Sequence, residues 1–213
     1  MAEANTVERI LDASEVLFAQ KGFSETSLRA ITSRAGVNLA AVNYHFGSKE
    51  ALIQAVFERF LTPFCEALQA RLDEMEARGE EISLERLLSV VSVLAMGSHG
   101  NDPRRAKLFF RLSGLAYAQA QGHLRTYLGQ RYGAVFRRLL RCLGRAAPDV
   151  PSMEMFWRVH FALGATIFTL SGMDSLRALC RDDFGEDLSA VEINARLLPF
   201  IVAGIRAPEG TAT

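Results

Sequence analysis

The sequence predicts an all-α fold, with an N-terminal three-helix unit followed by a larger helical domain. Apolar residues recur at helical spacing along the chain, and no segment shows the sustained apolar–polar alternation of a strand. The periodic stretches are short up to about residue 47 and long beyond it. We therefore expect an N-terminal domain over residues 1–47, a second domain over 48–207 and a tail over 208–213.

Three helices are predicted in the N-terminal domain. Asn5 is a candidate N-cap of the first helix, which Gly22 ends. The second helix begins after Thr26 and breaks at Gly36, and the third runs over about 39–46.

Longer helices are predicted in the second domain. Ser48 can cap a helix that ends near Glu80 and that Pro63 should kink, because proline removes one helical hydrogen bond. Ser189 and Glu192 have the spacing of a capping box at the start of the last helix. The remaining helices are expected over residues 83–96, 103–119, 123–146, 152–180 and 189–206.

Composition argues against several classes of protein. The 24 basic and 24 acidic residues balance, so the totals indicate neither disorder nor a globally basic nucleic-acid binder. The N-terminus lacks the basic start and apolar run of a signal peptide, and no stretch of about eighteen uncharged apolar residues follows. We expect a cytoplasmic protein with no membrane partner.

Cysteine and histidine spacing predicts neither disulfides nor a bound metal or other cofactor. Cys65, Cys142 and Cys180 are far apart, and the histidines form no HxH or HExxH group. The alternative from another class is an all-α enzyme built around His123, Arg158 and His160. No nucleophile and base stand at a suitable spacing, so we expect no enzyme.

The second and third predicted helices have the spacing of a helix-turn-helix within residues 26–46. Val42 and Phe46, four residues apart, can hold the inner face of the third helix against Leu28 and Ile31. A short helix that projects in this way can enter a major groove. Its outer side then carries Ala40, Ala41, Asn43, Tyr44 and His45.

Residues 26–52, TSLRAITSRAGVNLAAVNYHFGSKEAL, resemble the signature of the TetR family of transcriptional regulators. The resemblance implies that Arg29 and Lys49 meet phosphates, that Tyr44 and His45 contact the DNA backbone, and that the start of the third helix faces base edges. The DNA-binding residues that it leads us to expect are Thr26, Ser27, Arg29, Asn38, Leu39, Ala40, Ala41, Asn43, Tyr44, His45 and Lys49.

Two positions depart from the commonest family pattern, which has threonine in place of Ala41 and tyrosine in place of Asn43. The Asn43 amide can donate to N7 and accept from N6 of adenine, or it can bind solvent or a phosphate. Ala40 and Ala41 can touch thymine methyl groups or simply permit close approach.

One slightly acidic N-terminal domain would bind DNA weakly, whereas two in a dimer would bind a two-fold operator far better.

The last helices are predicted to form a homodimer. Residues 156–170 are apolar almost all round, and a helix of this kind must be buried on several sides. The helices over 152–180 and 189–206 resemble the family's four-helix dimer interface; the alternative is packing within one subunit only. The expected interface residues are Phe156, His160, Gly164, Ala165, Phe168, Ile193, Leu197 and Ile201.

Between Pro103 and Pro148 lie ten arginines or lysines and no acid. Most should be solvated, and some should pair with the acids of residues 66–85 or 174–192. One or two of these bases should lie among the nearby aromatic residues. A site of this kind would suit a long apolar ligand with an anionic end. The expected ligand-binding residues are Phe110, Arg111, Leu115, Arg125, Tyr127, Trp157, Arg158 and Phe161.

The whole chain resembles the PsrA-like subgroup of fatty-acid-responsive TetR regulators, through GLAYAQAQGHLRTYL, YGAVFRRLL and EMFWRVHFALGA. The similarity implies a repressor of fatty-acid metabolism genes that a long-chain fatty acid or acyl-CoA releases from operator DNA. The alternative is a TetR-type regulator of an efflux or other catabolic operon that responds to an aromatic or cationic compound. Acidic side chains facing the ligand pocket would favour a cationic ligand.

Overall fold

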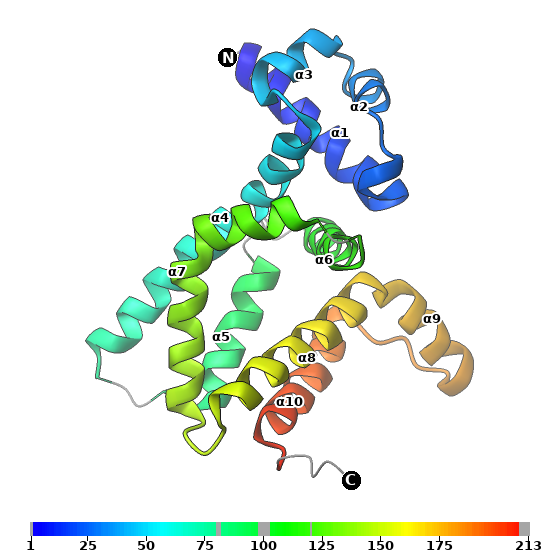
Figure 1. Cartoon of the computed structure of the whole chain (residues 1–213). Coiled ribbons are helices and arrows are strands. Elements are labelled where there is room, and N and C mark those ends of the chain that lie inside the picture. Colours follow the sequence, from blue (N-terminus) through cyan, green and yellow to red (C-terminus); the bar gives the residue numbers. More distant parts are fainter. Residues whose placement is uncertain (1, 80–81, 98–102, 120, 209–213) are drawn as a thin grey trace.

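The computed structural model of the chain describes residues 2–79, 82–97, 103–119 and 121–208. None of these residues lies in a strand, so the all-α prediction is confirmed. The helices of this part of the chain (Figure 1) are α1 (Ala2–Glu25), α2 (Leu28–Ala35), α3 (Leu39–Phe46), α4 (Lys49–Ala77), α5 (Leu84–Gly97), α6 (Pro103–Ala118), α7 (Gly122–Ala146), α8 (Ser152–Ser171), α9 (Met173–Phe184) and α10 (Ala190–Arg206).

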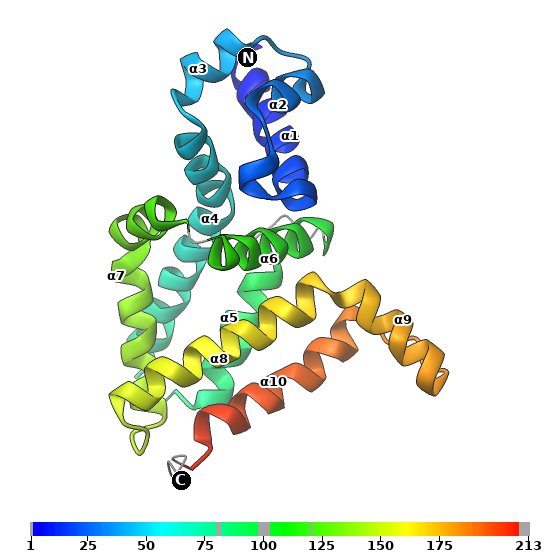
Figure 2. The same cartoon turned by 45° about the vertical axis from the view of Figure 1, so that its right-hand side comes forward.

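Helices α1–α3 form the head of the molecule, and α4–α10 form the body (Figures 1 and 2). In the head, Ile10 and Phe18 of α1 pack with Ile31 of α2 and Val42 of α3, and all four are essentially inaccessible to solvent. This confirms the inner face predicted for α2 and α3. In the body, α8 and α10 lie side by side, and α9 projects from their far end.

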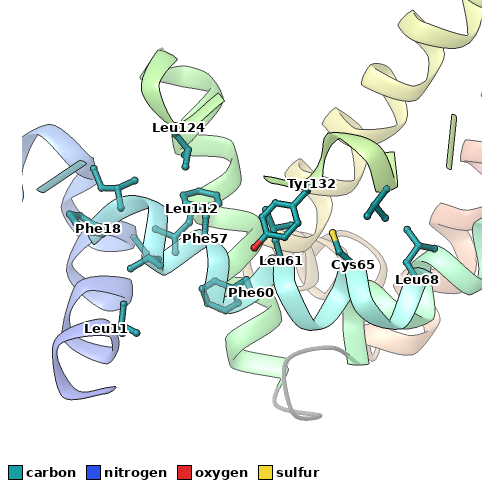
Figure 3. Packing of buried hydrophobic residues seen from close by; sticks show 14 of the residues in the cluster. Leu11, Phe18, Phe57, Phe60, Leu61, Cys65, Leu68, Leu112, Leu124 and Tyr132 are labelled. Atoms are coloured by element: carbon teal, nitrogen blue, oxygen red, sulfur yellow. The ribbon is translucent and has the colours of Figure 1, made fainter. Parts of the chain in front are cut away.

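Helix α4 connects the two parts through one continuous apolar cluster. Its buried side chains Phe57, Phe60, Leu61, Cys65 and Leu68 follow one another along the helix (Figure 3). Its first members, Phe57 and Phe60, meet side chains of α1 and α6, and farther along the stripe meets side chains of α7. Because head and body share this cluster, a shift of α4 or α6 must disturb the packing of the head.

Two predicted helix boundaries are wrong. Helix α1 begins at Ala2, so Asn5 lies inside the helix rather than capping it, since Ala-Glu-Ala before it favours helix. The single helix predicted over 152–180 is two helices that meet at Gly172, where a Cβ atom would stand 3.0 Å from the carbonyl oxygen of Phe168. Residue 80, at the expected end of α4, and most of the tail, 209–213, lie outside the described residues.

The caps predicted for the first and last helices of the second domain are confirmed. The Ser48 hydroxyl oxygen accepts a hydrogen bond from the N–H of Ala51 at 3.0 Å and caps α4. Ser189 and Glu192 form the reciprocal capping box of α10. Pro63 lies inside α4, which continues to Ala77.

Candidate nucleic-acid interface

The turn between α2 and α3 has a defined geometry that glycine makes possible. Gly36 has φ +64°, and the N–H of Val37 reaches back to the carbonyl of Thr32 at 3.0 Å. The Arg9 guanidinium of α1 donates to the carbonyl of Gly36 at 2.8 Å. A Cβ atom at Gly36 would lie 2.6 Å from that guanidinium, so a side chain here would displace Arg9 in addition to being strained at this φ.

Helix α3 presents a small, polar outer surface. Ala40 and Asn43 are exposed, and Tyr44 is 77% exposed, whereas Val42 on the opposite side is buried. His45 is half-buried, with its ring against those of Tyr44 and Phe46. The residues expected to face base edges therefore stand on one accessible surface.

Ser27 and Asn38 act first as helix caps. The Ser27 hydroxyl oxygen accepts from the N–H of Ala30 at 3.1 Å, and the Asn38 side-chain oxygen accepts from the N–H of Ala41 at 2.8 Å. Both side chains are exposed and keep hydrogen-bond donors for a phosphate. The helix N-termini that they cap attract anions because their N–H groups point outward.

Thr26, which we expected to contact DNA, has a fully buried side chain, so this prediction is wrong for a side-chain contact. Its hydroxyl lies 2.7 Å from the carbonyl of Gly22 and 3.2 Å from that of Leu17, and donates to these oxygens. The residue fixes the corner between α1 and α2.

The two expected phosphate-binding bases differ in their surroundings. Arg29 is exposed on α2. Lys49, the first residue of α4, is half-buried, and its ammonium donates to the carbonyl of Ser24 at 3.2 Å. An ammonium has three donors, so this bond leaves Lys49 able to meet a phosphate beside the same corner.

A buried carboxylate joins the head to the body. Glu15 of α1 is 3% exposed and lies 2.8 Å from the Arg59 guanidinium of α4 and 3.3 Å from that of Arg105 of α6. Arg59 also binds Glu8 and Asp12 at 2.7 Å each. Burial raises the pKa of Glu15, and the two arginines oppose that rise. Sequence reasoning missed this cluster, although Glu15 occupies an apolar-stripe position with Leu11 and Phe18.

A second joint lies at the other end of α6. Gly22 interrupts the helical backbone of α1 with φ +83° and ψ 170°, and the next residue, Phe23, donates its backbone N–H to the Gln119 side-chain oxygen at 3.0 Å. The Gln119 amide lies against Gly22, and a Cβ atom there would stand 2.5 Å from its nitrogen. Helix α6 is therefore tied to α1 at both ends, by Arg105 and by Gln119.

Gly22→Ala is expected to lower the free energy of unfolding by about 1–3 kcal/mol, because alanine is strained at this φ and its methyl group collides with the Gln119 amide. Thermal unfolding followed by circular dichroism measures the loss. Gly144→Ala in α7 is the matched control, since a Cβ atom there meets nothing within 4 Å. Equal stability of the two variants would contradict this account of the joint.

The predicted dimer face carries exposed aromatic side chains. Phe156 is 50% exposed and Phe168 69% exposed on α8, and Phe200 of α10 is 66% exposed. The other expected interface residues on these helices are exposed or half-buried: His160, Gly164, Ala165, Ile193, Leu197 and Ile201. Packing of α8 on α10 within one subunit leaves this apolar face uncovered.

The predicted ligand-binding residues do not converge on one cavity, and three of them contradict a buried anion site. The buried guanidinium of Arg158 donates to the carbonyl of Ile205 at 2.8 Å and binds Glu154, so it holds α8 to α10. Arg111 and Arg125 are exposed. Helical periodicity could not separate these roles, because it places a residue on a face without showing what covers that face.

The apolar members of the predicted ligand site are also dispersed. Phe110 is buried, Leu115 and Tyr127 are half-buried, and Trp157 and Phe161 are more than half exposed on α8. None of these residues lines either of the two hollows that we describe, which lie between α8, α9 and α10 and beside Glu76 and Arg138.

The expected pairing of the basic stretch is confirmed. Arg138 binds Asp73 and Glu76 at 2.7 and 2.8 Å, and Lys107 binds Asp174. Within the described ranges, no group of three or more histidine, cysteine, aspartate or glutamate residues is placed to hold a metal ion. In the same ranges, every helix is too short or too polar to cross a bilayer.

Comparison with known proteins identifies the family. Residues 10–56 match the model for bacterial regulatory proteins of the tetR family, and residues 90–204 match the tetracyclin repressor-like C-terminal domain. The probable HTH-type transcriptional regulator YttP of Bacillus subtilis is 28% identical over 99 residues, which are 46% of each chain. The regulator UidR of Escherichia coli is 38% identical over 68 residues, 30% of this chain and 35% of that protein. The chain thus spans less than half the length of these relatives.

Solved structures share the fold over nearly the whole chain. A TetR-like transcriptional regulator from Rhodococcus has a TM-score of 0.56 at 18% identity, covering 95% of this chain and 97% of that chain. Salmonella enterica GusR gives a TM-score of 0.56 at 18% identity, covering 95% and 96%. The helix-turn-helix, the helical body and the matched domains together show that this chain is a member of the TetR family of transcriptional regulators.

Proposed function

We propose that the chain acts as a homodimeric repressor that binds a two-fold operator through α3 and leaves it when a small apolar ligand binds the body. The observation that carries this proposal is the accessible surface of α3, with Asn43 and Tyr44 exposed on a helix-turn-helix that Arg9 fastens to α1. A helix with so small an outer surface fits a major groove about 12 Å wide.

Base reading and phosphate binding should respond differently to substitution. Asn43→Ala is expected to cost about 1–3 kcal/mol at one base position, because an exposed amide there can pair with adenine in two places. Lys49→Ala should weaken binding to all sequences alike. Gel-shift titration on the chain's own upstream DNA and on random DNA, over a range of salt concentrations, separates the two effects.

Arg34→Ala is the control for this pair, since Arg34 is an exposed base of α2 outside the expected contact set. Its substitution should change operator affinity less than Lys49→Ala does. If Asn43→Ala weakens specific and random DNA equally, Asn43 does not read a base.

The joints between head and body support control by a ligand. Arg59, Arg105 and Gln119 link α1 to α4 and α6, so a ligand that moves α6 would tilt the head. Such a ligand must bind more tightly to the state whose heads are wrongly spaced for the operator. A typical coupling of about 1–3 kcal/mol lowers operator affinity about 5- to 150-fold.

The ligand that we propose is a long-chain fatty acid or its coenzyme A thioester. The genes that the repressor controls would then be those of fatty-acid metabolism. The support is the subgroup resemblance, together with the aromatic interior formed by Phe57, Phe60 and Phe109. Arg111 and Arg125 are exposed, so they suit the anionic end of a ligand whose chain enters the body.

Acyl chains of increasing length should release the operator progressively better, because each buried CH₂ contributes about 0.8 kcal/mol until the site is full. Fatty acids and thioesters, kept below their micelle-forming concentrations, are titrated against the protein–operator complex. Arg111→Leu and Arg125→Leu should weaken release while sparing operator binding by the free protein. No release at any length, with no saturable heat in calorimetry, would refute this ligand and leave the operator proposal intact.

A further inference from the structure

An apolar hollow of about 490 Å³ lies between α8, α9 and α10. Ala165 and Phe168 of α8, Leu176 of α9, and Ile193 and Leu197 of α10 contribute to its walls. Phe168 is also one of the most exposed aromatic residues of the α8 and α10 face. The hollow is therefore a continuation of the face through which we propose that two copies meet.

Helix α9 has little support from its own chain. None of its 12 residues is buried, and Figures 1 and 2 show it projecting from the end of α8, away from α4 and α7. Polar contacts restrain it: Lys107 binds Asp174, and Arg177 binds Asp187 at 2.7 Å. A helix of this length is marginal in water without tertiary packing.

One side of α9 is apolar and uncovered. Met173, Leu176, Cys180 and Phe184 recur at helical spacing and form a stripe, of which Leu176 and Cys180 line the hollow. Phe184 continues the stripe beyond the hollow and is 77% exposed. A stripe of this kind is stabilised when another apolar surface covers it.

We propose that α9 is a dimerisation arm: in the homodimer, apolar side chains of the second copy fill the hollow, and the stripe of α9 packs on that copy. This inference rests on the proposed dimer through α8 and α10. A second copy fits because four residues of the expected interface, Ala165, Phe168, Ile193 and Leu197, are also walls of the hollow. A void left beneath them would forfeit packing at the centre of the interface.

Charge at the tip of α9 disfavours other macromolecular occupants. Asp182, Asp183 and Glu186 are exposed, and none of the three forms an ion pair with any residue that the structure describes. An acidic tip repels nucleic-acid phosphates and anionic lipid surfaces. An apolar face of the same chain carries no such penalty.

Phe184→Asp tests the arm directly. The side chain is largely exposed in one protomer, so the substitution should leave folding intact and raise the dissociation constant of the dimer on the order of 100-fold, because each dimer contains it twice. Ser175→Asp is the matched control, since it adds the same charge to the opposite side of α9. Sedimentation equilibrium measures both. Equal dissociation constants for the two variants would overturn the proposal.

The thiol of Cys180 reports whether the hollow is filled. Cys65 and Cys142 are buried, so an aromatic disulfide reagent should reach Cys180 first in the folded protein. We expect Cys180 to react on the order of 10-fold more slowly in the dimer than after dilution to monomers. A dimer whose Cys180 reacts at the monomer rate, or slow reaction in both states, would overturn the arm while leaving the α8 and α10 dimer standing. A monomer at micromolar concentration would instead refute the proposed dimer itself.

Discussion

Ala165→Arg and Phe168→Asp are each expected to convert the dimer into folded monomers and to reduce operator affinity about 100- to 10,000-fold. Both place charge on the face shared by α8 and α10, where a two-fold interface would bury it twice without a partner. Operator affinity falls because, in a dimer, binding of the first head holds the second head close to its half-site. A monomer lacks this gain in effective concentration. Sedimentation velocity gives the oligomeric state, and gel shift on the operator gives the affinity.

The folding of these variants can be checked independently. Phe168 is 69% exposed in the protomer, so its replacement should leave the thermal midpoint of a monomer unchanged. Leu140→Asp in α7 is the control, because Leu140 is a partly exposed apolar residue outside the α8 and α10 face. A variant that stays dimeric, or a monomer that binds the operator as tightly as the unmutated protein does, would show that this face does not join the heads.

Arg59→Met is expected to lower the free energy of unfolding by about 3 kcal/mol, the low end for a broken buried pair. It removes the nearest cation from the buried carboxylate of Glu15 and leaves only Arg105, at 3.3 Å. Denaturant unfolding of the variant and of Arg71→Met measures the difference. Arg71 is the control because its only described ion pair is with Glu74 on the exposed surface of α4.

The loss in Arg59→Met should depend on pH. Burial already raises the pKa of Glu15, and removing Arg59 takes away one of the charges that lower it. The folded variant therefore holds a proton more tightly than the unfolded chain does, so its stability increases as pH falls through the raised pKa. The deficit should shrink as pH is lowered from neutrality, and it should lose that dependence in Glu15→Gln/Arg59→Met. A deficit that is constant with pH would contradict the role given to Glu15.

The helix-turn-helix was predictable because its determinants are local. Gly36 must adopt a left-handed conformation, Asn38 and Ser48 cap the helices beside them, and Val42 faces inward by spacing alone. The unit therefore follows from residues that are neighbours in the sequence. Thr26 was misplaced because its buried hydroxyl serves the corner with α1, which the family pattern does not reveal.

The ligand-binding residues could not be predicted in the same way. Arg158 lies among apolar residues, as an anchor for an anion would, but its partners are Glu154 and the carbonyl of Ile205, 47 residues away. Gln119 and Phe23 meet across 96 residues. Contacts between residues so far apart in the sequence depend on how whole helices pack. The apolar periodicity within one helix does not predict them.

Footprinting of the operator tests the central claim most directly. Hydroxyl-radical cleavage of the chain's own upstream DNA, with protein at dimer-forming concentration, should show two protected regions on one face of the duplex, related by two-fold symmetry and about one helical turn or a multiple of it apart. Asn43→Ala should reduce protection in both halves equally. Protection of a single region, or a footprint unchanged by Asn43→Ala and Lys49→Ala together, would contradict operator binding by paired α3 helices.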